Sequence, residues 1–370
     1  MSTVIDCDSH FLPHDAFDDV DPAFASRAPR FVFGSGGKEI VVYNERTSQL
    51  PAYMANYPSV YQFARRTAGV FDADARVADL AKIGVDRQVL VPNNGPFGYD
   101  VDPQLGASVC RSYNNAVARA IEKHPGRFIG LAVMPMQDVK LAVEELERSV
   151  LELGLHAPQI GTNVLDRNLD EYELWPFYEK VEALGVPLIV HSSHLSVTGG
   201  SHRYKRYRFG NALQFPAEAS LAIGSLICGE VLENFPKLRV GFLEAGAGFL
   251  PYLFDRLDEV AVEEPQYTKL KLKKLPTEYL DQLWFSFNIK TEAKSLPFLI
   301  ERIGASRLML SSDYPHALAG SGANTVEFLR SLDTVSEEDK AQMAGLNAAR
   351  LFGLKDVAAN QSDRALAAAV

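Results

Sequence analysis

Cysteine is scarce in this sequence of 370 residues, which contains only Cys7, Cys110 and Cys228. The three are far apart, odd in number, and none belongs to a Cys-x-x-Cys pair. This pattern argues against both a disulfide framework and a zinc site built from cysteines. The same scarcity favours a reducing, cytoplasmic setting.

Long apolar runs and basic runs are also missing. No stretch reaches the roughly 18 consecutive apolar residues of a membrane span, and the first eight residues contain no basic segment that would begin a secretory signal. We therefore expect neither membrane insertion nor secretion. The formal net charge is −10, which argues against nucleic acid as the main partner.

What the sequence does contain is an alternation of short apolar segments with helical patterns, typical of parallel βαβ units. We expect, among others, one helix over about 214–234 and another over 336–352. Eight βαβ units favour a closed (β/α)8 barrel, or TIM barrel, over an open doubly wound α/β sheet. The segments predicted as strands begin near residues 3, 87, 128, 159, 186, 238, 284 and 307.

One segment, after the first predicted strand, interrupts this alternation. Residues 11–70 are rich in Pro, Asp, Gly and aromatic side chains, and loops of this length within a domain are usually functional. We interpret them as an insertion with a hairpin near 30–43, and we expect this insertion and the loop 192–214 to wall the mouth of a pocket. The barrel is predicted as a single domain, 1–355, followed by a frayed, Ala-rich tail, 356–370.

Side chains of metal-ligand type stand where several predicted strands end. Asp8 and His10 end the first strand, His191 the fifth, Glu244 the sixth and Asp313 the eighth. The C-terminal ends of barrel strands meet at one rim, where barrel enzymes have their active sites, so we expect these side chains to converge. Imidazole nitrogen together with carboxylate oxygen suits Zn(II), Mn(II) or Fe(II). The set therefore predicts a metal site that leaves room for water or substrate.

Three motifs on the first, fifth and eighth strands resemble those of the amidohydrolase superfamily. They are Ile-Asp-Cys-Asp-Ser-His-Phe-Leu-Pro (5–13), Leu-Ile-Val-His-Ser-Ser (188–193) and Ser-Ser-Asp-Tyr-Pro-His (311–316). Within that superfamily the chain resembles the amidohydrolase 2 branch, typified by 2-amino-3-carboxymuconate 6-semialdehyde decarboxylase and the γ-resorcylate decarboxylases. The resemblance extends over nearly the whole chain and is weakest between residues 14 and 70.

The resemblance implies a (β/α)8 barrel of the metal-dependent hydrolase type that holds a single divalent ion. Zinc is the first choice for this ion, with manganese or iron as alternatives. The resemblance also implies that Asp8, His10, His191 and Asp313 are the ligands, and that Asp313 both binds the metal and handles protons.

After the sixth strand the chain departs from the pattern, because decarboxylases of this branch have a His in the region where Glu244 stands here. We treat Glu244 as a second catalytic candidate, acting as a base, a hydrogen-bond acceptor or an extra ligand. The alternative is a structural carboxylate paired with an arginine such as Arg256. Because the environment of each carboxylate sets its pKa, we expect Glu244 to hold a proton more readily than the metal-bound Asp313.

The substrate-binding candidates are Arg65, His194 and His316. Arg65 lies in the insertion, and an arginine is suited to clamping a substrate carboxylate. His194 lies on the long loop after the fifth strand. His316, beside Asp313, could also orient a ligand through a hydrogen bond. For Arg65 and His194 the alternative is an ordinary surface or loop position.

The function predicted first is a non-oxidative decarboxylase that releases CO2 from a small aromatic or unsaturated carboxylic acid. The second is a hydrolase, in which water activated by Asp313 attacks an amide, lactone or ester. The third is a non-catalytic barrel that binds a small molecule, against which the intact ligand set argues. We expect a small-molecule substrate and a homodimer, in which the basic aromatic loop 203–208 is a candidate contact.

Overall fold

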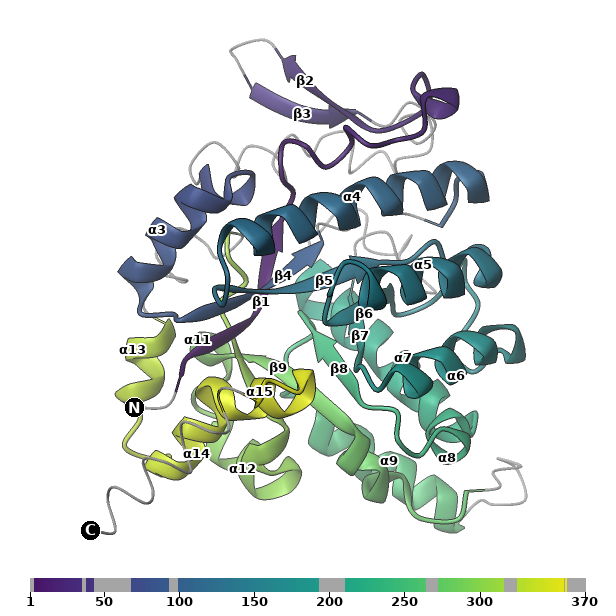
Figure 1. The fold of residues 1–370 in the computed structure, drawn as a ribbon. Coiled ribbons are helices and arrows are strands. Elements are labelled where there is room, and N and C mark those ends of the chain that lie inside the picture. The colour runs from purple at the N-terminus through teal and green to yellow at the C-terminus, as the bar shows by residue number, and fades with distance from the viewer. Residues whose placement is uncertain are drawn as a thin grey trace.

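The computed structural model describes residues 3–34, 38–42, 68–92, 99–192, 210–263, 272–315, 325–355 and 357. Eight parallel strands form one sheet in the order in which they occur in the chain (Figure 1). They are β1 (Ile5–Phe11), β4 (Arg87–Pro92), β5 (Phe128–Val133), β6 (Ala157–Gly161), β7 (Leu188–His191), β8 (Val240–Leu243), β9 (Leu283–Asn288) and β10 (Leu308–Ser311).

The first and last strands meet and close the sheet. Ser9 of β1 forms a parallel bridge with Tyr314, just after β10. In addition, the backbone N–H of His10 donates to the Tyr314 carbonyl at 2.6 Å. The predicted (β/α)8 barrel is thereby confirmed, and all eight predicted strands are present.

Helices lie between successive strands and cover the outside of the barrel (Figure 1). The described helices are α3 (Ala73–Ile83), α4 (Pro103–Lys123), α5 (Val139–Leu151), α6 (Trp175–Leu184), α7 (Phe215–Cys228), α8 (Val231–Asn234), α9 (Leu250–Glu263), α11 (Ile289–Glu292), α12 (Leu296–Ile303), α13 (Thr325–Arg330), α14 (Glu337–Ala341) and α15 (Asn347–Phe352).

Two helices expected to be single are divided. The one expected over 214–234 breaks at Glu230, whose φ of 65° is left-handed and ends a helix. The one expected over 336–352 contains a π-helical turn, Gln342–Leu346, between α14 and α15. The apolar spacing continues across both irregularities, so periodicity alone does not reveal them.

The strand side chains form two layers, one inside the barrel and one against the helices. Alternate residues such as Leu90, Val190 and Phe285 pack outward. Leu351 and Phe352 of α15 join the inner layer, which places α15 across one end of the barrel. The inner layer of the strands consists of Ile5, Cys7, Val89, Val91, Ile129, Leu131, Ala157, Ile189, Leu243, Trp284 and Met309.

A close contact identifies the end of the barrel that α15 covers. A Cβ atom on Gly345, just before α15, would lie 2.0 Å from the carbonyl oxygen of Thr3, which precedes β1. Only glycine allows this approach, and it brings α15 to the N-terminal end of the strands. The C-terminal ends, where the candidate residues stand, are therefore at the opposite rim.

The described part of the insertion confirms the predicted hairpin. β2 (Arg30–Gly34) and β3 (Lys38–Val42) pair antiparallel, and they lie at the top of Figure 1, beyond the end of β1. The segment before them packs along α4, where Arg119 forms ion pairs with Asp15 and Asp19 at 2.7 Å each.

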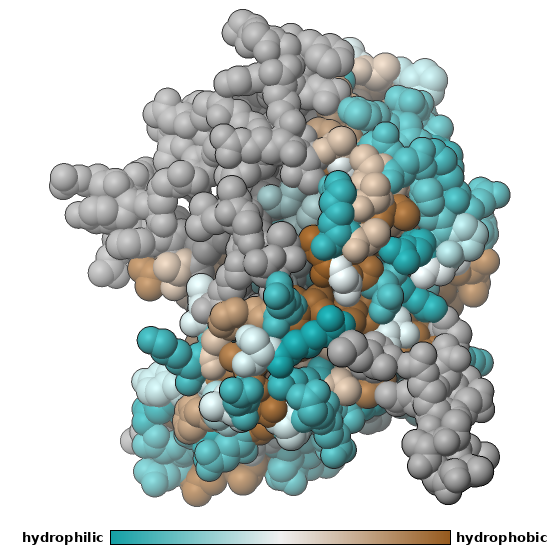
Figure 2. All heavy atoms as spheres, turned by 90° about the vertical axis from the view of Figure 1, so that its left-hand side faces the viewer, coloured by the Kyte–Doolittle hydropathy of each residue, from teal (hydrophilic) through white to brown (hydrophobic). Residues whose placement is uncertain are grey.

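The described surface and termini add two further observations. Figure 2 shows hydrophilic residues over much of the described part of one face, with hydrophobic ones between them in the middle and at the edges. Among the described helices, none combines the length and the apolar character that a bilayer crossing requires. Of the expected tail, only Val357 is described, and it is buried in the inner layer.

Candidate metal centre

A β-bulge in β1 turns the side chains of Asp8 and His10 into the barrel. In the pairing with β4, the three residue steps from Asp6 to Ser9 face only two steps on the partner strand. One extra residue reverses the alternation of inward and outward side chains beyond it. Since Cys7 already points inward, a regular strand would have turned Asp8 and His10 outward, against the helices.

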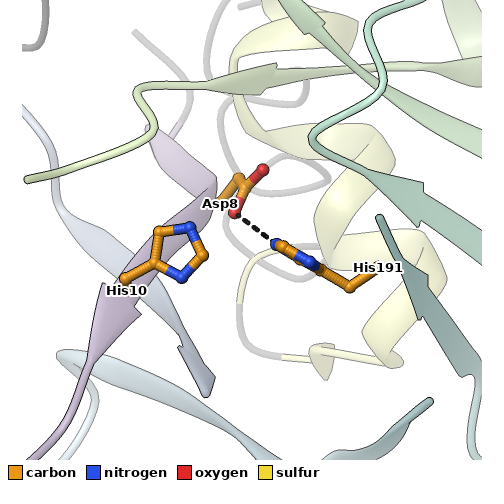
Figure 3. Close-up of side chains that lie close together, drawn as sticks. All are labelled: Asp8, His10 and His191. Carbon is orange, nitrogen blue, oxygen red and sulfur yellow. Dashed lines mark ion pairs between the residues drawn. The ribbon is translucent and has the colours of Figure 1, made fainter. Parts of the chain in front are cut away.

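His191 reaches the same point from the opposite wall. It is the last residue of β7, two positions after the inward-facing Ile189. Its Nε2 lies 3.6 Å from Oδ1 of Asp8, and the ring centroids of His191 and His10 are 5.2 Å apart (Figure 3). Both His191 and Asp8 are completely buried.

Glu244 and Asp313 complete the cluster from the ends of β8 and β10. Oε2 of Glu244 lies 3.1 Å from Nε2 of His191 and 3.7 Å from Nε2 of His10. Oδ1 of Asp313 lies 3.5 Å from Nε2 of His10. Potential ligand atoms of Asp8, His10 and His191 lie within 4.8 Å of one another, and so do those of His10, Glu244 and Asp313.

Both of these carboxylates stand on an unusual backbone. Glu244 has φ 66° and Asp313 has φ 54°, in the left-handed region that is costly for residues other than glycine. Neighbouring groups hold each position: the N–H of Glu244 donates to Oγ of Ser286 at 3.1 Å, and the N–H of Asp313 donates to the Asp8 carbonyl at 3.0 Å. Strained backbone of this kind concentrates at functional sites.

The distances suit a single ion. Two ligand atoms that are each about 2.1 Å from a metal are about 3.0 Å apart at an angle of 90° and about 3.6 Å apart at 120°. The four nitrogen–oxygen distances, from 3.1 to 3.7 Å, fall in or close to this interval.

Exposure of the cluster increases in one direction. The side chains of Asp8 and His191 are 0% exposed, whereas those of Glu244 and Asp313 are 13% and 22% exposed. A ligand would therefore reach the cluster from the side of Glu244 and Asp313.

The electrostatics of the cluster favour a bound cation. Burial lowers the pKa of His10 to about 4, so its imidazole is neutral near pH 7 and able to act as a ligand. Burial, followed by repulsion from Asp313 and Asp8, raises the pKa of Glu244 well above its usual range. Three carboxyl groups beside two imidazoles are a donor set that suits a divalent ion, so the residues present fit such an ion.

The structure brings together the five residues predicted from strand ends: Asp8, His10, His191, Glu244 and Asp313. The alternative partner proposed for Glu244 is wrong, because Arg256 pairs with Glu259 one turn along α9, at the exposed surface. The three predicted substrate-binding residues, Arg65, His194 and His316, lie outside the described residues.

Sequence reasoning missed the buried polar residues behind the cluster, among them Arg76 and Asp6. Burial raises the pKa of Asp6 to about 6, against the lowering effect of hydrogen bonds from Ser312 and Gln88. The sequence holds a signal for each: an arginine within the helix α3, and the Asp of the Ile-Asp motif, two residues before the ligand position Asp8.

Comparisons with known proteins identify the family of the chain. The sequence model of the Amidohydrolase family matches residues 5–354. The 2-amino-3-carboxymuconate-6-semialdehyde decarboxylase of Dictyostelium discoideum is 32% identical over 79% of this chain and 79% of that protein. The gamma-resorcylate decarboxylase of Polaromonas sp. is 28% identical over 76% of this chain and 87% of that protein.

A solved structure shares the fold. It is that of 5-carboxyvanillate decarboxylase from Novosphingobium aromaticivorans, complexed with manganese and 4-hydroxy-3-methoxy-5-nitrobenzoic acid. Its sequence is 21% identical, the TM-score is 0.76, and the match covers 95% of this chain and 96% of that one.

Proposed function

Since this chain belongs to the amidohydrolase family, we propose that it is a metal-dependent carboxy-lyase that removes CO2, without oxidation, from a small aromatic or unsaturated carboxylic acid. The main observation behind the proposal is that two histidines and three acidic side chains converge at the C-terminal rim of the barrel. Their cluster is open to solvent on one side, at Glu244 and Asp313. The choice of reaction is supported by relatives that are named decarboxylases and that align with more than three quarters of the chain.

In this proposal Asp8, His10, His191 and Asp313 hold one divalent ion, and Glu244 stands beside it. Zinc and manganese both suit imidazole and carboxylate donors. The manganese bound in the Novosphingobium structure favours manganese over the zinc expected from the sequence. Iron stays a third candidate.

The roles of the residues follow from their exposure and charge. When bound, the divalent ion supplies Lewis-acid stabilisation of negative charge on the substrate carboxylate and a neighbouring oxygen. Asp313, on the exposed side, delivers a proton to the carbon that carries the carboxylate. The C–C bond then breaks, its electron pair restores the unsaturated system, and CO2 leaves. Glu244, whose side chain is 13% exposed beside the cluster, relays a proton from solvent back to Asp313.

The alternatives have less support. Hydrolysis of an amide, lactone or ester would use the same cluster, with Asp313 taking a proton from water, but the relatives named above are decarboxylases. A barrel kept only for binding would not need two overlapping groups of potential metal ligands, Asp8 with His10 and His191, and His10 with Glu244 and Asp313.

Four further assignments belong to this proposal. Arg65, His194 and His316 would contact the substrate, and residues 1–355 would form one domain. The protein would act in the cytoplasm, as the scarce cysteines suggest, and it would be a homodimer. Light scattering at micromolar concentration tests the last point, since a monomer there would contradict it.

The reaction is tested by a panel of carboxylic acids labelled with 13C in the carboxyl group. We expect the manganese-loaded protein to release 13CO2 from at least one hydroxybenzoic or unsaturated acid, and to lose that activity when the metal is chelated. Turnover of esters, lactones or amides without CO2 release from any acid would favour the hydrolase instead.

Replacing Glu244 by Gln should keep the metal and slow the reaction. The amide preserves size but cannot relay a proton, so we expect kcat to fall at least about tenfold, with one ion still bound. Glu259→Gln is the matched control, because Glu259 lies at the exposed surface of α9. If Glu244→Gln turns over as fast as the wild type, Glu244 is structural.

A further inference from the structure

A buried polar network lies behind the metal centre, on the outer side of β1, and the proposed chemistry does not use it. Its centre is Arg76 of α3, which is fully buried. The guanidinium donates to the Gly69 carbonyl at 2.7 Å, to Ser9 Oγ at 3.0 Å and to Gln88 Oε1 at 2.9 Å. It also donates to the carbonyl oxygen of His10.

The same network continues to the end of β10. Nε2 of Gln88 donates to Oδ2 of Asp6 at 2.8 Å. Asp6 in turn accepts from the backbone N–H of Ser312 at 2.9 Å and from its hydroxyl at 2.5 Å. The Ser312 hydroxyl accepts from the N–H of Tyr314 at 3.1 Å, and the Tyr314 ring lies 4.7 Å from the guanidinium of Arg76.

The residues contacted by this network are neighbours in the sequence of the proposed ligands. Ser9 stands between Asp8 and His10, and Ser312 stands directly before Asp313. A bulge disrupts the local ladder of backbone hydrogen bonds, so its geometry depends on other partners. Here buried side chains bind the backbone and side chains of the bulge and tie it to the neighbouring strand end.

A simpler role for Arg76 would be to attach α3 to the barrel. That helix has other attachments, because Asp79 accepts from the hydroxyl of Tyr314 at 2.8 Å and Asp74 pairs with Lys123 at 2.7 Å. Two of the four acceptors of Arg76, on Ser9 and His10, lie in β1 itself, and a third, Gln88, lies on the strand paired with it. Most hydrogen bonds of Arg76 therefore go to the bulge and to the strand paired with it.

We propose that Arg76 is a positioning residue, which holds the bulge of β1 in the register that turns Asp8 and His10 towards the metal ion. The inference rests on the proposed metal centre, and it adds a residue to which neither the motifs nor the ligand cluster assign a role. It predicts that metal affinity depends on a side chain that does not touch the metal.

The test is Arg76→Lys, which keeps the positive charge but lacks the planar fork of donors that reaches several acceptors at once. Chelator-treated protein is titrated with Mn2+ by calorimetry, and circular dichroism checks that the variant is folded. We expect the Kd for Mn2+ to rise about 10- to 100-fold, as when groups that orient ligands are removed. The visible spectrum of bound Co2+ should also change, because it reports ligand geometry.

Arg148→Lys is the matched control. Arg148 of α5 is also largely buried, with a side chain 12% exposed, and it bonds Glu145 at 2.7 and 2.8 Å and Asn115 at 2.9 Å. Its partners lie on the outer helices α4 and α5. This variant should lose stability without changing the Kd or the Co2+ spectrum.

Three results would contradict the inference, and they show whether Arg76 or the metal centre itself is at fault. A Kd for folded Arg76→Lys within about threefold of the wild type, with the same Co2+ spectrum, would overturn the inference. If Arg76→Lys does not fold, Ser9→Ala decides. It removes the hydroxyl that accepts from Arg76 and donates to the Val89 carbonyl, and an unchanged Kd and spectrum would overturn the inference equally. If the wild type itself binds no Mn2+, the proposed metal centre fails, and the inference fails with it.

Discussion

Replacing Asp313 by Asn is expected to lower kcat at least about a thousandfold, a loss of about 4 kcal/mol of transition-state stabilisation. The amide has the size of the carboxyl group but cannot transfer a proton to the substrate carbon. Asn also tolerates the left-handed backbone at this position, φ 54°, so the fold should be retained. The measurement is CO2 release at saturating substrate and Mn2+.

Saturating Mn2+ is essential, because Asp313 is also a proposed ligand and its loss should weaken metal binding. Asp281→Asn is the matched control, since Asp281 is 83% exposed and pairs with Arg307 away from the cluster. The account would be contradicted if Asp313→Asn, fully loaded with metal, retained more than about a tenth of the wild-type kcat.

Replacing His191 by Ala is expected to remove both the metal and the activity. His191 is fully buried between Asp8 and Glu244, so no other side chain takes its place when the imidazole is lost. The bound metal should fall from one equivalent of Mn2+ to less than about a tenth, since only three of the four proposed protein ligands would remain.

Thermal unfolding measures the loss of metal binding in His191→Ala independently. A ligand that binds only the folded state, present at 100 times its Kd, stabilises that state by about 2.7 kcal/mol. Added Mn2+ should therefore raise the Tm of the wild type and not that of His191→Ala. His156→Ala, which removes a histidine preceding β6 at the opposite end of the barrel, should respond to Mn2+ like the wild type. Equal Tm increases in wild type and His191→Ala would count against His191 as a ligand.

The sequence predicts the barrel and the cluster for a clear physical reason. Buried parallel strands are short apolar runs, and the residues that end them at the C-terminal rim are polar, so Asp8, His191 and Asp313 stand out against their surroundings. The motifs around them then assign the family, which the match over residues 5–354 confirms.

The sequence does not reveal how the backbone orients the side chains of the cluster. Strict alternation along β1 would place Cys7 and Asp8 on opposite faces, and only the observed pairing with β4 shows the extra residue that puts both inside. The left-handed φ angles of Glu244 and Asp313 are equally invisible, because glycine or asparagine would be the usual signal and neither stands there. The role of Arg76 is invisible for a related reason: its partners in the bulge, His10 and Ser9, are 66 and 67 residues away in the chain.

The most direct test of the metal centre is anomalous diffraction at the manganese edge from crystals grown with Mn2+. The account predicts one strong peak per chain, about 2.0 to 2.4 Å from ligating atoms of Asp8, His10, His191 and Asp313, with Glu244 beside it. A map with no peak at this rim, or with its peak held by other residues, would contradict the account.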